Sequence, residues 1–266
     1  MKKHLLLIFL MCFVYNLQSQ VLIALLLGDK LNTGKIEFGL DGGLNYSSIS
    51  GLESNNFSRT FNLGFYFDIK MKGQWLLNTG VAVKSTLGAS KLTNADLEFL
   101  GATIYDFEDE RFNGGDYTQK MSAFLVPVMA KYKFKNHMHV EAGPQFGWIY
   151  RSWIEYDNED DNDNSIKIKE DNKDMINWFD MGVAGGVGYR FLKDLGWTVS
   201  VRYYYGLTNV YKNKSGTNNS SLFLKLNIPF GVSDEKKEEI KNMKAHLKQK
   251  KTEKKAAKKK KKAEEN

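Results

Sequence analysis

The feature that most constrains this chain is a regular alternation of large apolar residues with small or polar ones, repeated in eight stretches after Gly34. From Phe61 to Met71, for example, Phe, Leu and Ile alternate with Asn, Gly, Tyr, Asp and Lys. Successive side chains of a β-strand point to opposite faces of the sheet, so each stretch predicts a strand with one apolar face. The predicted strands span residues 36–46, 61–71, 75–83, 124–134, 138–150, 179–191, 199–207 and 222–230.

The connectors between these stretches alternate in length. The short ones are residues 72–73, 135–137 and 192–196, and the long ones are residues 48–58, 85–116, 151–174 and 210–220. Short turns on one side and long loops on the other are typical of outer-membrane barrels. We therefore predict an all-β fold over residues 35–232, an eight-stranded antiparallel transmembrane β-barrel. The alternative is a soluble eight-stranded barrel of the lipocalin kind, with the apolar face inside.

Aromatic residues near the strand ends favour the membrane barrel. Beside the short turns lie Trp75, Phe134, Phe191, Trp197 and Phe230. Beside the long loops lie Tyr46, Phe61, Trp148, Tyr150 and Trp178. Two such rings match the aromatic girdles that mark the two interfaces of a membrane. The last stretch ends in Ile228-Pro229-Phe230, the kind of terminal signal by which such barrels are recognised for assembly.

The first residues predict export. Lys2 and Lys3 precede 11 apolar residues, Leu5 to Tyr15, and Ser19 provides a small residue for cleavage. We expect residues 1–19 to be a signal peptide and residues 20–34 a periplasmic N-terminal segment; the alternative is an uncleaved anchor helix over residues 5–27. The single cysteine, Cys12, falls in the signal, which excludes disulfides and cysteine-based metal sites from the mature chain.

The net charge of +7 belongs to the C-terminal tail. Residues 233–266 hold 14 lysines against 7 acidic residues, whereas residues 20–232 hold 22 basic and 24 acidic residues. Lysines from Lys237 to Lys262 recur at spacings of three and four, which predicts a basic, partly helical tail. One hypothesis is that this periplasmic tail contacts peptidoglycan, inner-leaflet phosphates or an acidic envelope protein; the other is a solvated extension. Nucleic acid is excluded as a partner by the compartment.

Four segments resemble the PorT-like outer-membrane barrel family of Bacteroidota: residues 20–32, 124–128, 141–145 and 202–209. The resemblance covers residues 20–232. It implies a location in the outer membrane, among its lipids, and a structural or accessory role in the cell envelope. It also implies a link to type IX protein secretion, because the family takes its name from an accessory protein of that machinery.

An eight-stranded barrel encloses only enough space for side chains. The alternation points six principal ionisable residues inward, Asp41, Asp68, Glu141, Asp180, Arg190 and Arg202. It also points inward Lys70, Lys84, Lys131, Lys133 and Lys225. Buried charges need partners, so we predict an ion-pair network that closes the lumen, in which Asp180 and Arg190, or Glu141 and Arg202, meet opposite charges. The alternative is a narrow channel for cations or small solutes.

No catalytic residue, cofactor or metal site is predicted. The histidines are His4, His137, His139 and His246, so the long connectors contain no base for a Ser–His arrangement. His137 and His139 lie beside a short turn, and we expect both to be structural.

The two longest connectors are acidic. Residues 85–116 and 151–174 each carry a net charge of −5. The run over residues 157–163 is either a solvated loop or a weak divalent-cation site that bridges to lipid phosphates. We expect these connectors outside the cell and both termini in the periplasm, as in an even-stranded barrel whose first strand starts there.

Overall fold

A computed structural model describes residues 35–54, 56–104, 115–159, 165–192 and 196–230, together with eight single residues between positions 238 and 253. The strands are β1 (Ile36–Ile49), β2 (Asn56–Lys70), β3 (Trp75–Ser90), β4 (Asp116–Lys133), β5 (Met138–Glu159), β6 (Ser165–Asp171), β7 (Phe179–Arg190), β8 (Thr198–Asn209) and β9 (Asn218–Pro229). A short helix, α3 (Asn94–Leu100), follows β3, and a single turn of 3-10 helix, η2 (Lys173–Met175), precedes β7.

The predicted signal peptide, residues 1–19, and the predicted N-terminal segment, residues 20–34, lie outside the described residues. So does most of the predicted tail, whose eight described residues are helical and exposed. No helix within the described ranges is long and apolar enough to cross a membrane.

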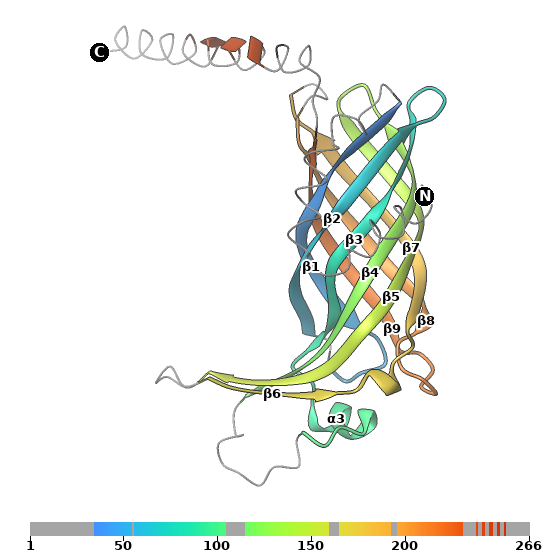
Figure 1. The fold of residues 1–266 in the computed structure, drawn as a ribbon, viewed down its shortest axis with the longest axis vertical. Coiled ribbons are helices and arrows are strands. Elements are labelled where there is room, and N and C mark those ends of the chain that lie inside the picture. Colours follow the sequence, from blue (N-terminus) through green and yellow to red (C-terminus); the bar gives the residue numbers. More distant parts are fainter. Residues whose placement is uncertain are drawn as a thin grey trace, which may run out of the picture.

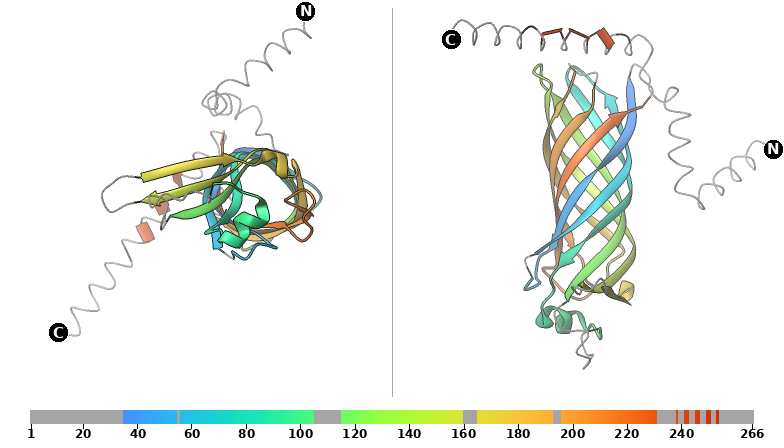
Figure 2. Two further views of the ribbon diagram at one scale, coloured as in Figure 1. Left: turned by 90° about the horizontal axis from the view of Figure 1, so that it is seen from below. Right: turned by 90° about the vertical axis from the view of Figure 1, so that its left-hand side faces the viewer.

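Eight of the strands form a closed antiparallel ring, which confirms the predicted fold (Figure 1). Neighbours in sequence pair from β1 to β5, β5 pairs with β7, and β9 returns to pair with β1. β6 pairs only with the far half of β5 and stands outside the ring. The barrel therefore has two ends, one with the short turns and the ends of the ring, and one with the long connectors (Figure 2).

The seam between β1 and β9 requires glycine. Gly43 stands opposite Lys225 in this pairing and has a φ of +154°. A Cβ atom at this position would overlap the carbonyl oxygen of Leu224. Glycine lets the two backbones approach at the point where the ring closes.

The outer face of the barrel is apolar between two girdles of aromatic residues, one near each end. The exposed apolar residues of the middle band include Val128, Val140, Val183, Val187, Val199, Val201, Leu222 and Leu224. At the long-connector end the rings of Trp148 and Trp178 lie 5.3 Å apart, and at the short-turn end Trp75 contacts Tyr132 at 5.0 Å. This surface suits a lipid environment, with aromatic rings where headgroups begin.

The connectors at the long-connector end contain more structure than the alternation predicted. Residues 151–174 were expected to form a loop, but β5 continues to Glu159 and β6 returns along it to Asp171. This β5–β6 hairpin leaves the barrel sideways, across the barrel axis (Figures 1 and 2). The 85–116 connector likewise contributes the end of β3 and all of α3.

One inward assignment is wrong. Lys84 was predicted to point into the lumen, but the pairing of β3 with β4 shifts register between Ala82 and Ser85. Such an irregularity adds a residue to one strand and reverses the faces beyond it. Ser85 is therefore buried and Lys84 is exposed.

Candidate functional site: the barrel lumen

Four ion pairs lie in the half of the lumen nearer the short turns. They are Glu141–Arg202 at 2.7 Å, Asp68–Lys131 at 2.8 Å, Asp41–Lys225 at 2.9 Å and Glu37–Arg190 at 2.7 Å. Only Asp41 and Lys225 come from neighbouring strands, β1 and β9. The other three pairs join strands that are not adjacent in the ring, so their side chains reach across the interior.

Hydrogen bonds join two of these pairs into one chain. The Asn78 amide nitrogen donates to Asp68 at 2.7 Å, and the Arg202 guanidinium donates to the Asn78 amide oxygen at 2.9 Å. The resulting series runs from Lys131 through Asp68, Asn78 and Arg202 to Glu141, and all five side chains are buried. Because each charge is matched and hydrogen-bonded, the network can persist away from bulk water.

Arg190 meets an opposite charge, but from a strand that sequence reasoning did not pair with it. Both terminal nitrogens of Arg190 donate to Glu37, at 2.8 and 2.7 Å, in a bidentate arrangement. Tyr66 also donates its hydroxyl to Glu37, at 2.9 Å. Glu37 lies on the inward face of the first alternating stretch, so its position was visible in the sequence although its partner was not.

Asp180 differs from the expectation. Its carboxylate accepts hydrogen bonds from Thr208 at 2.7 Å and from Asn219 at 3.0 Å, both neutral groups. Among the described residues no cation forms an ion pair with Asp180. The side chain is buried deeper toward the long-connector end, beyond the four ion pairs.

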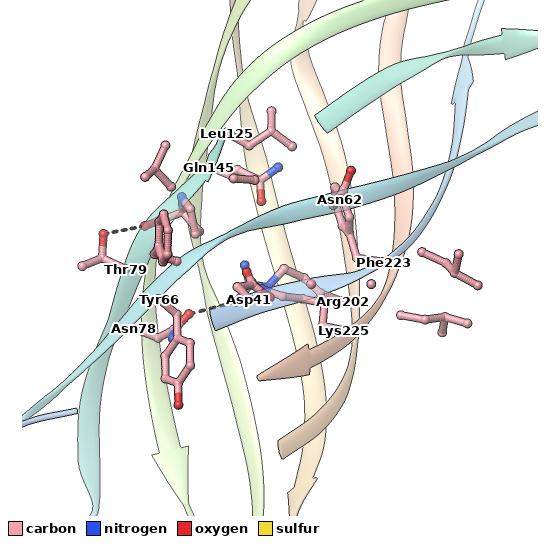
Figure 3. A pocket seen from close by; sticks show the side chains of 18 residues that line it. Asp41, Asn62, Tyr66, Asn78, Thr79, Leu125, Gln145, Arg202, Phe223 and Lys225 are labelled. Atoms are coloured by element: carbon pink, nitrogen blue, oxygen red, sulfur yellow. Dashed lines mark hydrogen bonds and ion pairs between the residues drawn. The ribbon is translucent and has the colours of Figure 1, made fainter. Parts of the chain in front are cut away.

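A cavity of about 30 Å³ lies beside the chain of ion pairs, with Arg202 and Asn78 among its lining residues (Figure 3). This space holds about two water molecules. The buried amide nitrogen of Gln145, which also lines the cavity, has no hydrogen-bond partner in the described part of the protein. The cavity therefore suits trapped water better than a solute.

The other half of the lumen is filled by an apolar cluster together with buried polar side chains such as Asn45, Gln119 and Asn219. Leu87, Met121, Ile149 and Tyr156 are at most 3% exposed and belong to one buried cluster. Leu97 and Leu100 of α3 complete this cluster. Viewed along the barrel, α3 lies across the opening at the long-connector end (Figure 2).

Asp96 holds α3 in place. Its carboxylate accepts hydrogen bonds from the backbone of Glu53 at 2.6 Å, Ser54 at 3.0 Å and Thr93 at 3.0 Å. Thr93 is the N-cap of the helix, and its hydroxyl accepts a hydrogen bond from the Asp96 backbone N–H. This capping box ties the helix to the β1–β2 connector, because the same carboxylate serves both segments.

No cluster of the usual metal-binding side chains and no arrangement for histidine-dependent catalysis is present among the described residues. His139 is buried in the lumen and His137 lies in the β4–β5 turn. No group of three His, Cys, Asp or Glu side chains within the described ranges is placed to hold a metal ion. The acidic run over residues 157–163 falls largely outside them.

A closed antiparallel ring with a lipid-compatible exterior and a side-chain-filled interior defines a small outer-membrane β-barrel. Residues 18–212 match the family model of the outer membrane protein beta-barrel domain, and the chain belongs to this family. The protein is accordingly placed in the outer membrane. A search of curated proteins found no match.

Solved structures of small outer-membrane barrels resemble the chain at low identity. The attachment invasion locus protein Ail of Yersinia pestis, solved with the heparin analogue sucrose octasulfate, has a TM-score of 0.41 and 10% identity over 74% of this chain and 99% of its own. The outer membrane protein AlkL has a TM-score of 0.35 and 14% identity over 76% and 94%. OprG from Pseudomonas aeruginosa has a TM-score of 0.32 and 10% identity over 73% and 91%. These likenesses concern the kind of fold and carry no ligand or activity across.

Proposed function

We propose that the protein is a non-conducting outer-membrane barrel with a structural or accessory role in the cell envelope. The observation that carries this proposal is the filling of the lumen in two different ways along its length. A solute would have to part Glu141 from Arg202 in one half and displace the apolar cluster under α3 in the other. Because both halves are filled with side chains, the lumen has no open path of the kind that a channel needs.

Planar-bilayer recording of the full chain tests this proposal. We expect the wild type to give little stable conductance. A matched variant in which Leu97 and Leu100 are replaced by Ser loosens only the apolar half and should conduct no better, because the ion pairs remain. A steady current from the wild type would contradict the closed barrel and favour the alternative, a narrow channel for cations or small solutes.

For the orientation, we propose that the short turns face the periplasm and the β5–β6 hairpin faces outward. The supporting observation is that the ring begins and ends beside the short turns, since Gly39 pairs with Pro229 there. A tag inserted near residue 162 should be accessible to antibody on intact cells, whereas a tag after Asn266 should need permeabilised cells. Labelling of the C-terminal tag on intact cells would refute this orientation.

We further propose that the Lys-rich tail, residues 233–266, is the part that contacts envelope partners or peptidoglycan, and that the accessory role is linked to type IX secretion. The motifs at residues 124–128 and 202–209, which resemble PorT-like barrels, motivate the second statement. Co-purification from native outer membranes, comparing the full chain with a chain truncated after Val232, tests the tail. Normal export of type IX substrates in a deletion strain would refute the link to secretion.

A further inference from the structure

Asp180 leaves the charges of the lumen unbalanced among the described residues. The four ion pairs match four carboxylates with four cations, and Asp180 is one carboxylate more. It is 3% exposed, and its two hydrogen-bond donors, Thr208 and Asn219, are neutral. An ionised carboxylate is costly to bury alone, so buried charges are normally paired or coordinate a metal ion. Asp180 therefore requires a cation that the described side chains around it do not supply.

The nearest candidates within the protein cannot serve as this cation. Gly147 stands opposite Asp180, and His139 lies eight positions back along the same strand, roughly 27 Å away at about 3.4 Å per residue. Arg202 lies on the neighbouring strand β8, but its guanidinium is engaged by Glu141, further toward the short turns. The missing charge must therefore come from outside the chain.

Three buried oxygen atoms around Asp180 have no hydrogen-bond partner in the described part of the protein. They are the amide oxygen of Asn219 and the hydroxyl oxygens of Tyr204 and Ser221. The nitrogen of the same Asn219 amide donates to Asp180 at 3.0 Å. Tyr204 interacts electrostatically with Asp180 and stands directly opposite Ser221, the inward neighbour of Asn219 on β9. All three residues are at most 1% exposed, so bulk water does not reach these atoms.

Two inward-facing glycines allow these groups to gather. A Cβ atom on Gly206 would lie 3.2 Å from the Asp180 carboxylate, and one on Gly182 would lie 2.7 Å from the Tyr204 ring. Gly182 is the inward neighbour of Asp180 on β7 and stands opposite Gln145, which lines the cavity of about 30 Å³ (Figure 3). The space for trapped water thus adjoins this level of the lumen, and water there can complete the coordination of a small cation.

We propose that Asp180, Tyr204, Asn219 and Ser221 bind one Na⁺ ion inside the closed lumen. Hard cations take oxygen ligands, and a single carboxylate with neutral oxygens matches a single positive charge, whereas Ca²⁺ sites commonly use several carboxylates. A water molecule could bond to the free oxygens, but it would leave the charge of Asp180 uncompensated. The ion thus completes the charge balance of the lumen and stabilises the folded barrel.

Urea unfolding of the full chain from phospholipid vesicles, with Na⁺ exchanged for tetramethylammonium at constant ionic strength, tests the proposal. A ligand that binds only the folded state acts by mass action. Each tenfold rise in Na⁺ above its dissociation constant should therefore lower the unfolding constant of the wild type about tenfold. S221A keeps the carboxylate but removes one oxygen ligand, so it should need more Na⁺ for the same effect. D180N should show no dependence on Na⁺.

The matched control is D41N, which changes a lumen carboxylate that already has a cation, Lys225. Whatever its stability, D41N should keep the wild-type dependence on Na⁺. Heat-dependent migration in gels checks that each variant is folded, and S221A decides the matter if D180N does not fold. A wild type that ignores Na⁺, or an equal response in wild type and S221A, would overturn the proposal. The measurement does not involve conductance, so its failure is separable from failure of the proposed function.

Discussion

Removing Arg202 alone should destabilise the barrel much more than the loss of one ordinary hydrogen bond. Its side chain is 3% exposed and donates to Glu141 at 2.7 Å and to Asn78 at 2.9 Å. In R202M the Glu141 carboxylate stays buried without this guanidinium, and removing one partner of a buried pair costs about 3–5 kcal/mol. E141Q keeps the shape but leaves the buried Arg202 guanidinium without its counter-charge, so its cost should also be about 3–5 kcal/mol. The double variant leaves no unmatched charge from this pair, so its loss should fall about 2 kcal/mol short of the sum.

Urea unfolding from phospholipid vesicles, followed by tryptophan emission under reversible conditions, gives the free energies of unfolding for this cycle. The control cycle uses K91Q and D116N, whose side chains are 62% and 58% exposed and 3.8 Å apart. The control coupling should be at most about 0.5 kcal/mol, because exposed pairs contribute little. A coupling that small between Glu141 and Arg202 would refute the idea that the lumen is held by matched buried charges.

Three further outcomes are expected. Partial burial raises the pKa of the Glu155 carboxyl, but hydrogen bonds from Lys120 and Trp153 outweigh this effect and lower the pKa to about 2. The ionised Glu155 therefore stabilises the hairpin above pH 4.5, and this stabilisation is lost as pH falls toward 2. Hydrogen exchange of the hairpin amides should become faster over this pH range, relative to the rest of the barrel, in the wild type and not in E155Q. D96A should destabilise α3 by about 1–3 kcal/mol, seen as faster proteolysis of the β3–β4 connector in a barrel that is still folded; unchanged proteolysis would count against the anchoring role. G43A should slow or prevent refolding into vesicles, whereas G42A, where a Cβ would meet only ordinary contacts at 3.6 Å or more, should refold at close to the normal rate.

Much of the barrel could be predicted because each strand of a membrane barrel faces lipid on one side and the barrel interior on the other. Apolar residues therefore alternate with small or polar residues along the sequence. The wall strands, their ring and the inward direction of Glu141 and Arg202 all follow from that alternation. The partner of Arg190 does not, because the stagger of a barrel decides which inward residues stand at the same level. The partners of Asp180 could not be predicted for the same reason, because the stagger places this carboxylate beside Thr208 and Asn219 and not beside a cation.

The hairpin was missed because the charge of residues 151–174 was interpreted as evidence for a loop. Beyond the membrane both faces of a strand can be polar, so a strand there loses the contrast that marks the wall strands. A weaker signal was present: Ile166 and Ile168 alternate with Lys167 and Lys169. The displaced register at Lys84 had no such signal, because an irregularity in pairing depends on the neighbouring strand.

The lumen is packed differently in its two halves, and each kind of packing suits the surroundings of that half. In the half near the short turns, the wall faces lipid and the interior can be polar, because strands around the ring supply matched charges that meet inside the barrel. Toward the long-connector end the strands of the 85–116 and 151–174 connectors rise beyond the aromatic ring, and an apolar cluster there gains from exclusion of water, as in a water-soluble core. That cluster also fixes the base of the hairpin, since Tyr156 and Ile154 belong to it.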